Sequence, residues 1–345
     1  METFPKPPTI TDVARHAQVS PATASRALSG RGSVSEATRD RVQRSARALG
    51  YAVDINASSL VTGRSHTVGV IMPAVGRWFF GEVLEGIQLA LQERAYDLVL
   101  YHVRRGTSSR SDVFRYFLAR RRFDGIIVAG MDPDMEEAKH LSKLGIPLVS
   151  VGGYDIGASI VSIDDRTAAR IATEHLIQLG HRDIAFVGGP DGAEVSHGDA
   201  RRLEGYLEAM SEAGLGSRAR HAASEVSMPS GYRMSAELLG DRRTRPTAIV
   251  GVCDEVAIGA VIAARRLGIS VPTQLSIVGI DDHENAEMFS LTTVRQRPHL
   301  QGREAVRLLF EQLRNPAAPP TRFTDQAALI VRASTAALES TAALE

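Results

Sequence analysis

From His66 onward the sequence alternates between short apolar runs and longer amphipathic stretches, and this alternation constrains the fold more than any other feature. Short runs rich in β-branched residues are typical of strands that are buried on both faces of a parallel sheet. The expected strands are TVGVIM, YDLVLYHV, GIIVAG, PLVSVG, IVSI, DIAFVGG, AIVGV and LSIVGID. The amphipathic stretches predict helices that include 81–94, 167–179, 201–212 and 255–267.

This pattern predicts a doubly wound α/β body with parallel sheets. A stretch of about 270 residues exceeds one ordinary domain, so we expect two lobes. Ligands of such folds bind beyond the carboxyl ends of the strands. The sequence therefore places a ligand site in the cleft between the lobes.

The first 60 residues are of a different kind, because they predict short helices with clear start signals. Thr9, with Asp12 three residues on, forms a carboxylate version of the capping box. Ser20 is the expected N-cap of a second helix, with Pro21 at its first position. Ser35 is the expected N-cap of a third.

The first two helices are joined by the tight Gln18-Val19 connection and braced by the third. This layout matches the helix-turn-helix, in which the second helix enters the major groove of DNA. The first 66 residues carry nine basic and five acidic side chains, a net +4, although the whole chain is neutral. A basic head on a mildly acidic body suits a phosphate-binding module attached to a domain of another kind.

Segments of both regions resemble the LacI/GalR family of bacterial transcription regulators. In the head these are TITDVARHAQVSPATASRALSG, VSEATRDRV and NASSLVTGRSHTVGVI. In the body they include FDGIIVAG, VSIDDRTAARIATEHLIQLGHRDIAFVGG, ARRLEGY, VCDEVAIGA and VPTQLSIVGIDD, and the match continues to about Ser334. The resemblance implies a helix-turn-helix head on an α/β body of the periplasmic-binding-protein type. That body has two Rossmann-like lobes, with chain crossings near residues 165, 295 and 325.

The resemblance also implies the DNA contacts. Residues 54–61 match a hinge helix that orders on the operator, with Leu60 wedged into the minor groove and Ala57 facing it. The alternative is an amphipathic linker whose Leu60 packs on the body. Arg26 matches a base-reading position and can contact guanine O6 and N7, or else clamp a phosphate. The expected contacts of the head are Thr11, Ser20, Pro21, Ala22, Thr23, Ser25 and Arg26.

In the body, the resemblance assigns Arg202 to holding effector hydroxyls or a carboxylate, and Asp281 to accepting hydrogen bonds from the same molecule. An arginine and a carboxylate on one small polyol are typical of sugar binding. The aromatic residues 78–80 follow the first strand and can face a sugar ring, although Phe80 also suits the core. Asp254 either contacts the effector or caps the next helix. The expected effector contacts are Trp78, Phe79, Phe80, Arg202, Cys253, Asp254 and Asp281.

The sequence predicts four segments. They are a helix-turn-helix domain at 1–52, a hinge helix and linker at 53–65, a two-lobed effector-binding and dimerisation domain at 66–333, and a disordered tail at 334–345. STAALE occurs twice in the tail, but the tail has no heptad repeat and is too short for a stable coiled coil. We therefore expect a homodimer.

Other features argue against competing chemistry. A single cysteine fits a reducing cytoplasm and excludes a disulfide framework. No residues repeat at metal-ligand spacing and no G-x-G-x-x-G fingerprint follows a strand, so neither a metal, a cofactor nor an enzyme activity is expected. We expect no membrane span and no signal peptide. Asp164 and Asp165 are expected to cap the helix that follows them.

The sequence thus predicts a cytoplasmic, nucleoid-associated repressor of carbohydrate-utilisation genes. It would bind double-stranded operator DNA as a homodimer and be released by a mono- or disaccharide, since catabolic regulation dominates the family. Two alternatives stay open. One is a family regulator controlled by a non-sugar metabolite or a protein coregulator. The other is a sugar-binding transport protein, which would need a signal peptide and would have no use for the head.

Overall fold

The computed structural model describes residues 8–29, 33–51, 64–104, 107–120, 123–153, 157–189 and 196–338. The chain divides into two compact units, a head over Met1–His66 and a body over Thr67–Glu345. Each unit has hydrophobic core of its own.

The head contains three short helices, α1 (Ile10–His16), α2 (Pro21–Ser29) and α3 (Glu36–Leu49). Their apolar faces meet in a core made mostly of alanine and valine, which lets the helix backbones approach closely. Arg41 of α3 donates from Nε to the backbone oxygen of Ala17 at 2.9 Å and so braces the end of α1. The buried residues of this core are Val13, Ala14, Ala17, Ala24, Ala27, Val42 and Ala46.

The three predicted helix starts are confirmed. Thr9 and Asp12 form a complete capping box, in which each side chain accepts a hydrogen bond from the other residue's backbone N–H. Ser20 Oγ accepts from the backbone N–H of Thr23 at 3.1 Å, and Ser35 caps α3 in the same way. Local capping therefore determines where each helix of the head begins.

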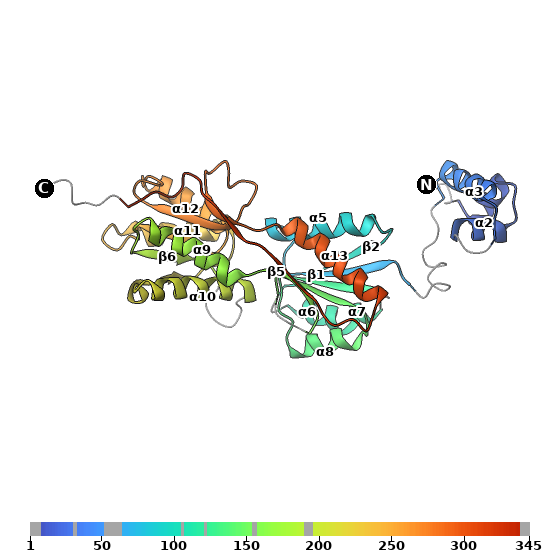
Figure 1. The fold of residues 1–345 in the computed structure, drawn as a ribbon, viewed down its shortest axis with the longest axis horizontal. Coiled ribbons are helices and arrows are strands. Elements are labelled where there is room, and N and C mark those ends of the chain that lie inside the picture. Colours follow the sequence, from blue (N-terminus) through green and yellow to red (C-terminus); the bar gives the residue numbers. More distant parts are fainter. Residues whose placement is uncertain are drawn as a thin grey trace. The chain divides into compact units, whose positions relative to one another are not determined.

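The N-terminal lobe of the body is a parallel six-stranded sheet of order β11-β5-β4-β3-β1-β2. Figure 1 shows α5 and α13 side by side on one face of this sheet, and α6, α7 and α8 on the other. The strands are β1 (Thr67–Met72), β2 (Asp97–His102), β3 (Gly125–Ala129), β4 (Leu148–Val151), β5 (Ser159–Ile163) and β11 (Arg322–Asp325). The helices are α5 (Trp78–Gln92), α6 (Ser108–Asp112), a π-helix (Val113–Phe117), α7 (Leu118–Arg120), α8 (Met135–Lys143) and α13 (Pro298–Arg314).

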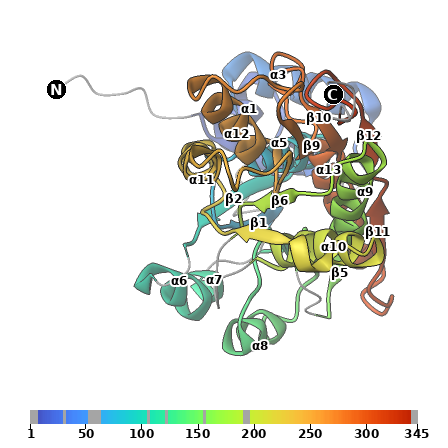
Figure 2. The same cartoon turned by 90° about the vertical axis from the view of Figure 1, so that its left-hand side faces the viewer.

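The C-terminal lobe repeats this plan with the order β12-β10-β9-β8-β6-β7, in which only the β10–β12 pair is antiparallel among the described strands. Figure 2 shows α9 beside α10, and α11 beside α12. The strands are β6 (Ile184–Val187), β7 (Arg220–Ala222), β8 (Ala248–Gly251), β9 (Ser276–Asp281), β10 (Thr292–Arg295) and β12 (Ala328–Ile330). The helices are α9 (Asp165–Gln178), α10 (His197–Glu212), a 3-10 turn (Gly216–Arg218), α11 (Met228–Gly240) and α12 (Asp254–Arg266).

The chain crosses between the lobes three times, as expected: between β5 and α9, between β10 and α13, and between β11 and β12. Two of these crossings are tied together, because the backbone N–H and the Nε of Arg297 both donate to the Asp325 carboxylate, at 3.0 and 2.9 Å. The described residues contain no helix that is both long and apolar enough to cross a membrane.

All eight expected strands are present, but β7, β10, β11 and β12 were not among them. Each has only three or four residues, and β7, β10 and β11 also carry polar positions, so none shows the longer apolar run that marks a buried strand. The expected starts of the four helices of the body lie too late by one to four residues. α10, for example, begins at His197 because Ser196 caps it through the backbone N–H of Asp199.

The prediction of a disordered tail from residue 334 is wrong for its first five residues. Ser334 Oγ donates to the backbone oxygen of Ile277 at 2.6 Å, and the Leu338 N–H donates to the oxygen of Leu179 at 2.8 Å. Residues 334–338 therefore belong to the C-terminal lobe. Residues 339–345 lie outside the described part of the chain.

Candidate functional site

The head presents one polar face of α2 to solvent. Ala24 and Ala27 turn inward to the core, whereas the helix start and the positions one turn later are exposed. Ser20, Pro21, Ala22, Ser25 and Arg26 are the exposed positions among the expected DNA contacts on this helix, and Thr11 is exposed on α1.

Three of the expected DNA contacts already use their side chains within the head. Thr23 is half-buried and its hydroxyl lies 2.9 Å from Ser20 Oγ, so both side chains serve the cap of α2. Arg26 donates from Nε to the backbone oxygen of Ala22 at 3.2 Å, which holds the base of the guanidinium against its own helix. The two contacts expected in the hinge, Ala57 and Leu60, lie outside the described residues.

The body contains a cavity of about 360 Å³ between its two lobes. Its wall combines arginines and carboxylates with two aromatic rings, which matches the size and polarity expected of a small-molecule site. The described residues that line it are Pro73, Arg77, Phe79, Phe80, Arg104, Arg110, Gly130, Met131, Asp132, Gly152, Ile163, Asp165, Ser196, Gly198, Asp199, Arg202, Asp281, Gln296 and Gln301.

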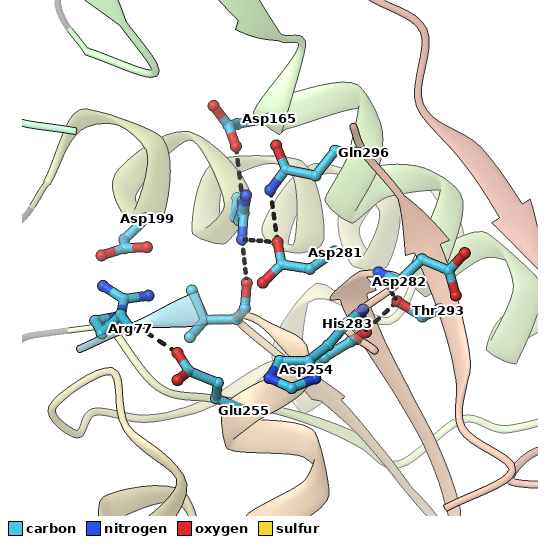
Figure 3. Close-up of polar contacts among 12 residues, drawn as sticks. Arg77, Asp165, Asp199, Asp254, Glu255, Asp281, Asp282, His283, Thr293 and Gln296 are labelled. Carbon is cyan, nitrogen blue, oxygen red and sulfur yellow. Dashed lines mark hydrogen bonds and ion pairs between the residues drawn. The ribbon is translucent and has the colours of Figure 1, made fainter. Parts of the chain in front are cut away.

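Arg202 on α10 is fixed in this wall by two hydrogen bonds and a further ion pair. Its Nε donates to Asp165 Oδ1 at 2.8 Å, its Nη1 donates to the backbone oxygen of Val252 at 2.7 Å, and Nη1 lies 3.6 Å from Asp281 Oδ1. Asp281 in turn accepts from Gln296 Nε2 at 2.6 Å. Figure 3 shows Asp165, Asp281 and Gln296 converging from separate elements. Such braced donors and acceptors suit vicinal hydroxyl groups.

Burial and charge shift the pKa values of these groups in opposite ways. Burial alone would lower the pKa of Arg202, but the carboxylates of Asp165 and Asp281 outweigh it and raise the pKa above its ordinary value. Burial raises the pKa of Asp281 to about 6, and Arg202 limits that rise. At neutral pH the wall therefore holds a charged arginine beside an ionised Asp281.

Asp254 lies behind this wall at the start of α12 and is completely buried. Its two carboxylate oxygens accept from Thr293 Oγ1 at 2.7 Å and from the backbone N–H of His283 at 2.9 Å. Burial, followed by the nearby charge of Asp281, raises the pKa of Asp254 to about 8. Asp254 therefore ties the start of α12 to the loop after β9 and to the start of β10 (Figure 3).

Contacts between the lobes surround the cavity. Arg77 Nε lies 3.3 Å from Glu255 Oε2, and the Trp78 and His283 rings lie 4.9 Å apart. The backbone N–H at the start of α10 donates to Asp132 Oδ2 at 2.8 Å. In each pair one partner follows a strand of the N-terminal lobe and the other belongs to the C-terminal lobe. The lobes therefore meet directly beside the cavity.

Comparison with known proteins identifies both units. Residues 9–54 match the family model described as "Bacterial regulatory proteins, lacI family", and residues 173–335 match a periplasmic binding protein-like domain. The repressor CytR of Escherichia coli K12 is 32% identical over 339 residues, covering 96% of this chain and 97% of CytR. The chain belongs to the LacI family. It is a DNA-binding transcription regulator.

Solved structures of LacI-family proteins match the whole fold. A complex of the regulator CelR with cellobiose superposes with a TM-score of 0.70 and 30% identity, covering 95% of this chain and 99% of CelR. The lac repressor dimer bound to operator and the anti-inducer ONPF superposes with a TM-score of 0.83 and 25% identity, covering 96% and 100%. These matches confirm the expected helix-turn-helix head and two-lobed α/β body.

The structure separates the expected effector contacts of this LacI-family chain into two groups. Phe79, Phe80, Arg202 and Asp281 line the cavity. The other three do not line it: the Trp78 ring lies 4.9 Å from the His283 ring, Cys253 is buried at the start of α12, and Asp254 accepts hydrogen bonds from Thr293 and from the backbone of His283. Contact of these three side chains with the effector stays a prediction.

Sequence reasoning missed several lining residues. Asp164 caps α9 as expected, but Asp165 pairs with Arg202 on the cavity wall and does not act as a cap. Arg77 and Asp132 follow predicted strands, so their position at a carboxyl end was a usable signal. Gln296 follows β10, and without that strand nothing in the sequence marks it. Among the described residues, no cluster of histidine, cysteine and acidic side chains is suited to a metal ion.

Proposed function

We propose that this LacI-family regulator represses carbohydrate-utilisation genes and leaves its operator when a small sugar fills the cavity. The observation that carries the proposal is Arg202, held between Asp165 and Asp281 on the wall between the lobes. Fixed donors and acceptors beside the aromatic rings of Phe79 and Phe80 suit a hydroxylated ring. The cellobiose complex of CelR supports this choice of ligand class.

On the DNA side, α2 enters the major groove of a double-stranded operator, and Arg26 contacts guanine O6 and N7. Ser20, Thr23 and Ser25 lie near the phosphates together with Thr11, whereas Pro21 and Ala22 read shape or a thymine methyl. Leu60 and Ala57 act in the minor groove. The operator-bound lac repressor dimer supports a homodimeric assembly.

The two sites communicate through lobe closure. A sugar that contacts both lobes binds best when the lobes hold one arrangement, so it shifts the equilibrium toward that arrangement. The dimer face and the two hinges change with it, with a coupling free energy of about 1–3 kcal/mol. We propose that the sugar acts as an inducer, which means that its binding lowers the affinity for the operator. The protein then acts in the cytoplasm, at the nucleoid, and carries out no catalysis of its own.

The test has two stages. A thermal-shift screen of the full-length protein against neutral mono- and disaccharides comes first, because a ligand at 100 times its Kd adds about 2.7 kcal/mol of stability. Any sugar that stabilises the protein is then added to a complex with a fluorescent operator, and we expect release. Stabilisation without release, or tighter operator binding, would contradict induction. No stabilisation by any sugar would favour a non-sugar metabolite or a protein coregulator.

A further inference from the structure

One pair of rings connects the two lobes beside the cavity. Trp78 begins α5 in the N-terminal lobe, and His283 follows β9 in the C-terminal lobe. Their ring centroids lie 4.9 Å apart, and the ring planes are inclined by 32°. His283 is only 6% exposed, so its imidazole has little contact with water. The ring contact exists only while the lobes hold this arrangement.

The backbone that carries the imidazole is held in place. The N–H of Asp282 donates to Thr293 Oγ1 at 3.2 Å, and the N–H of His283 donates to Asp254 Oδ2 at 2.9 Å (Figure 3). Asp281 and Asp282 have φ angles of 141° and 58°, which residues with side chains rarely adopt. Such a turn persists only where its surroundings enforce it. The ring of His283 therefore leaves its place by rotation of the side chain or by separation of the lobes.

A hydrogen bond to the ring determines its protonation state. The backbone N–H of Asn285 donates to His283 Nδ1 at 2.9 Å. A ring nitrogen accepts only through its lone pair, so Nδ1 carries no proton and the imidazole is neutral. Protonation of Nδ1 would bring two N–H groups face to face and remove this hydrogen bond. Because the backbone is fixed, the charged ring must then turn away from Asn285.

Charged groups from both lobes surround the imidazole. Burial has the largest effect and lowers the pKa of His283 from its ordinary 6.5, although the carboxylates of Glu255, Glu284 and Glu82 act in the opposite direction. The other charged groups on these elements have partners of their own. These pairs are Asp254 with Thr293, Asp282 with Arg332, and Arg77 with Glu255.

The two arrangements of the lobes therefore differ in their affinity for a proton. With the lobes together the pKa of His283 lies below 6.5, and with the lobes apart the ring meets water and its pKa is about 6.5. The proton binds better to the second arrangement, so acid shifts the equilibrium toward separated lobes. The ring contact is complete well above pH 6.5 and is lost as the pH falls below that value.

We propose that Trp78 and His283 form a latch between the lobes that a proton releases, so that acid lowers the affinity of the body for its effector. The sugar favours the lobes together, and the proton favours them apart. The effect on effector affinity rests on the proposed function, whereas release of the latch does not. The body thus combines two signals, a carbohydrate and the acidity of its surroundings.

The first experiment uses Trp78, the only tryptophan of the chain, as the reporter. In the full-length protein without sugar, lowering the pH from 7.5 to 5.5 should move the emission maximum to longer wavelength and increase quenching by acrylamide, because the indole becomes exposed to water. The change should reverse at pH 7.5, and its midpoint should lie below pH 6.5. An unchanged circular dichroism spectrum distinguishes release of the latch from unfolding.

Two substitutions of His283 test its titration. His283→Phe keeps a ring against Trp78 but cannot take up a proton, so its emission should stay at short wavelength at both pH values. His283→Asn keeps an acceptor for the Asn285 N–H without a ring, and its emission should lie at long wavelength at both. His175→Asn is the matched control, because burial also lowers the pKa of His175 but its Nε2 contacts Thr335 within the C-terminal lobe. It should respond to pH as the wild type does.

The second experiment is calorimetric titration with cellobiose as the probe. The Kd of the wild type should rise about two- to tenfold between pH 7.5 and pH 5.5, since a difference of one pKa unit corresponds to a factor of about ten. Asp281 lines the cavity and has a pKa of about 6, so part of this rise belongs to it. The part that His283→Phe loses belongs to the latch.

The outcomes separate the latch from the proposed function. An emission maximum that does not move in the wild type, or that moves equally in His283→Phe, would overturn the latch even if cellobiose binds. A fall in intensity without a change in wavelength or in acrylamide quenching would also overturn it, because the protonated ring then quenches Trp78 without leaving it. An equal rise of Kd in the wild type and His283→Phe would overturn the effect on effector affinity. A latch that responds to pH in a protein that binds no sugar would contradict the proposed function alone.

Discussion

Arg77 Nε lies 3.3 Å from Glu255 Oε2, so an arginine at the start of α5 is paired with a carboxylate at the start of α12. The two side chains belong to different lobes and are 30% and 16% exposed, so solvent screens the pair only partly. The pair stabilises the arrangement in which the lobes meet beside the cavity.

Glu255→Gln should therefore weaken sugar binding about two- to fivefold by making that arrangement less favourable. Calorimetric titration measures the change. Glu93→Gln is the matched control, because Glu93 pairs with Arg303 at 2.9 Å within one lobe. Equal effects of the two substitutions would argue against a role for the interlobe pair.

Arg202→Ala should remove the sugar response and destabilise the body. It leaves the buried carboxylate of Asp281 and the half-buried carboxylate of Asp165 without their cation, which costs about 3–5 kcal/mol of stability at pH 7.5. The cost should shrink near pH 5, because loss of Arg202 moves the already raised pKa of Asp281 further up and the group then becomes neutral. Thermal unfolding at both pH values measures this.

The matched control is Arg166→Ala, which removes a solvent-exposed arginine that pairs with Glu208 on α10, and its melting temperature should stay unchanged. Operator binding by Arg202→Ala below its melting temperature should persist, because the head has its own core. A retained sugar response would mean that Arg202 does not hold the effector.

The elements that could be predicted from the sequence are those with a local cause. Strands such as β3 are buried on both faces, so each shows a continuous apolar run, and the caps of the head need only residues within one turn. β10 and β12 depend on pairing with each other and with β9. Their own residues do not reveal that pairing.

The site shows the same division. Arg202 and Asp281 were found through the resemblance, but the role of Asp165 depends on how α10 packs against α9. The position of Asp254 depends on Gly279, because a Cβ there would lie 2.0 Å from Asp254 Oδ1. A distant glycine that makes room for a carboxylate leaves no local signal.

Leu60→Ala should weaken operator binding, because a smaller side chain fills the minor-groove step less well and bends the duplex less. Affinity for the sugar should stay the same. Fluorescence anisotropy with an operator duplex and calorimetry with the sugar measure the two quantities separately. Unchanged operator affinity would contradict the wedge.

Arg26→Ala should reduce specific operator affinity by about 1–3 kcal/mol and relax the preference at one guanine. Arg44→Ala is a close control, since Arg44 is also exposed and also donates from Nε to a backbone oxygen one turn earlier. Arg44 lies on α3, away from the reading helix, so its loss should lower affinity for all sequences alike. If Arg26→Ala also lowers the affinity for all operator sequences by the same factor, Arg26 contacts a phosphate and does not read a base.

Asp254 should make the stability of the body depend on pH. Its pKa is raised from 3.8 to about 8, so the folded state holds a proton that the unfolded state releases. Between pH 3.8 and about pH 8 the free energy of unfolding therefore falls as pH rises, by at most about 1.4 kcal/mol per pH unit for each carboxyl group with a raised pKa. Asp254→Asn cannot ionise, yet its amide oxygen can still accept from the His283 N–H and its nitrogen can donate to Thr293.

Denaturant unfolding between pH 5 and pH 8.5 should therefore give a steeper decline for the wild type than for Asp254→Asn. Asp241→Asn is the control, because Asp241 is exposed and its pKa is lowered from 3.8, so it is ionised in both the folded and the unfolded state over this range and should not change the slope. Part of the slope should remain in Asp254→Asn, since the pKa of Asp281 is also raised. Equal slopes for Asp254→Asn and the wild type would mean that Asp254 is ionised throughout this range, stabilised by its two hydrogen bonds in spite of its burial.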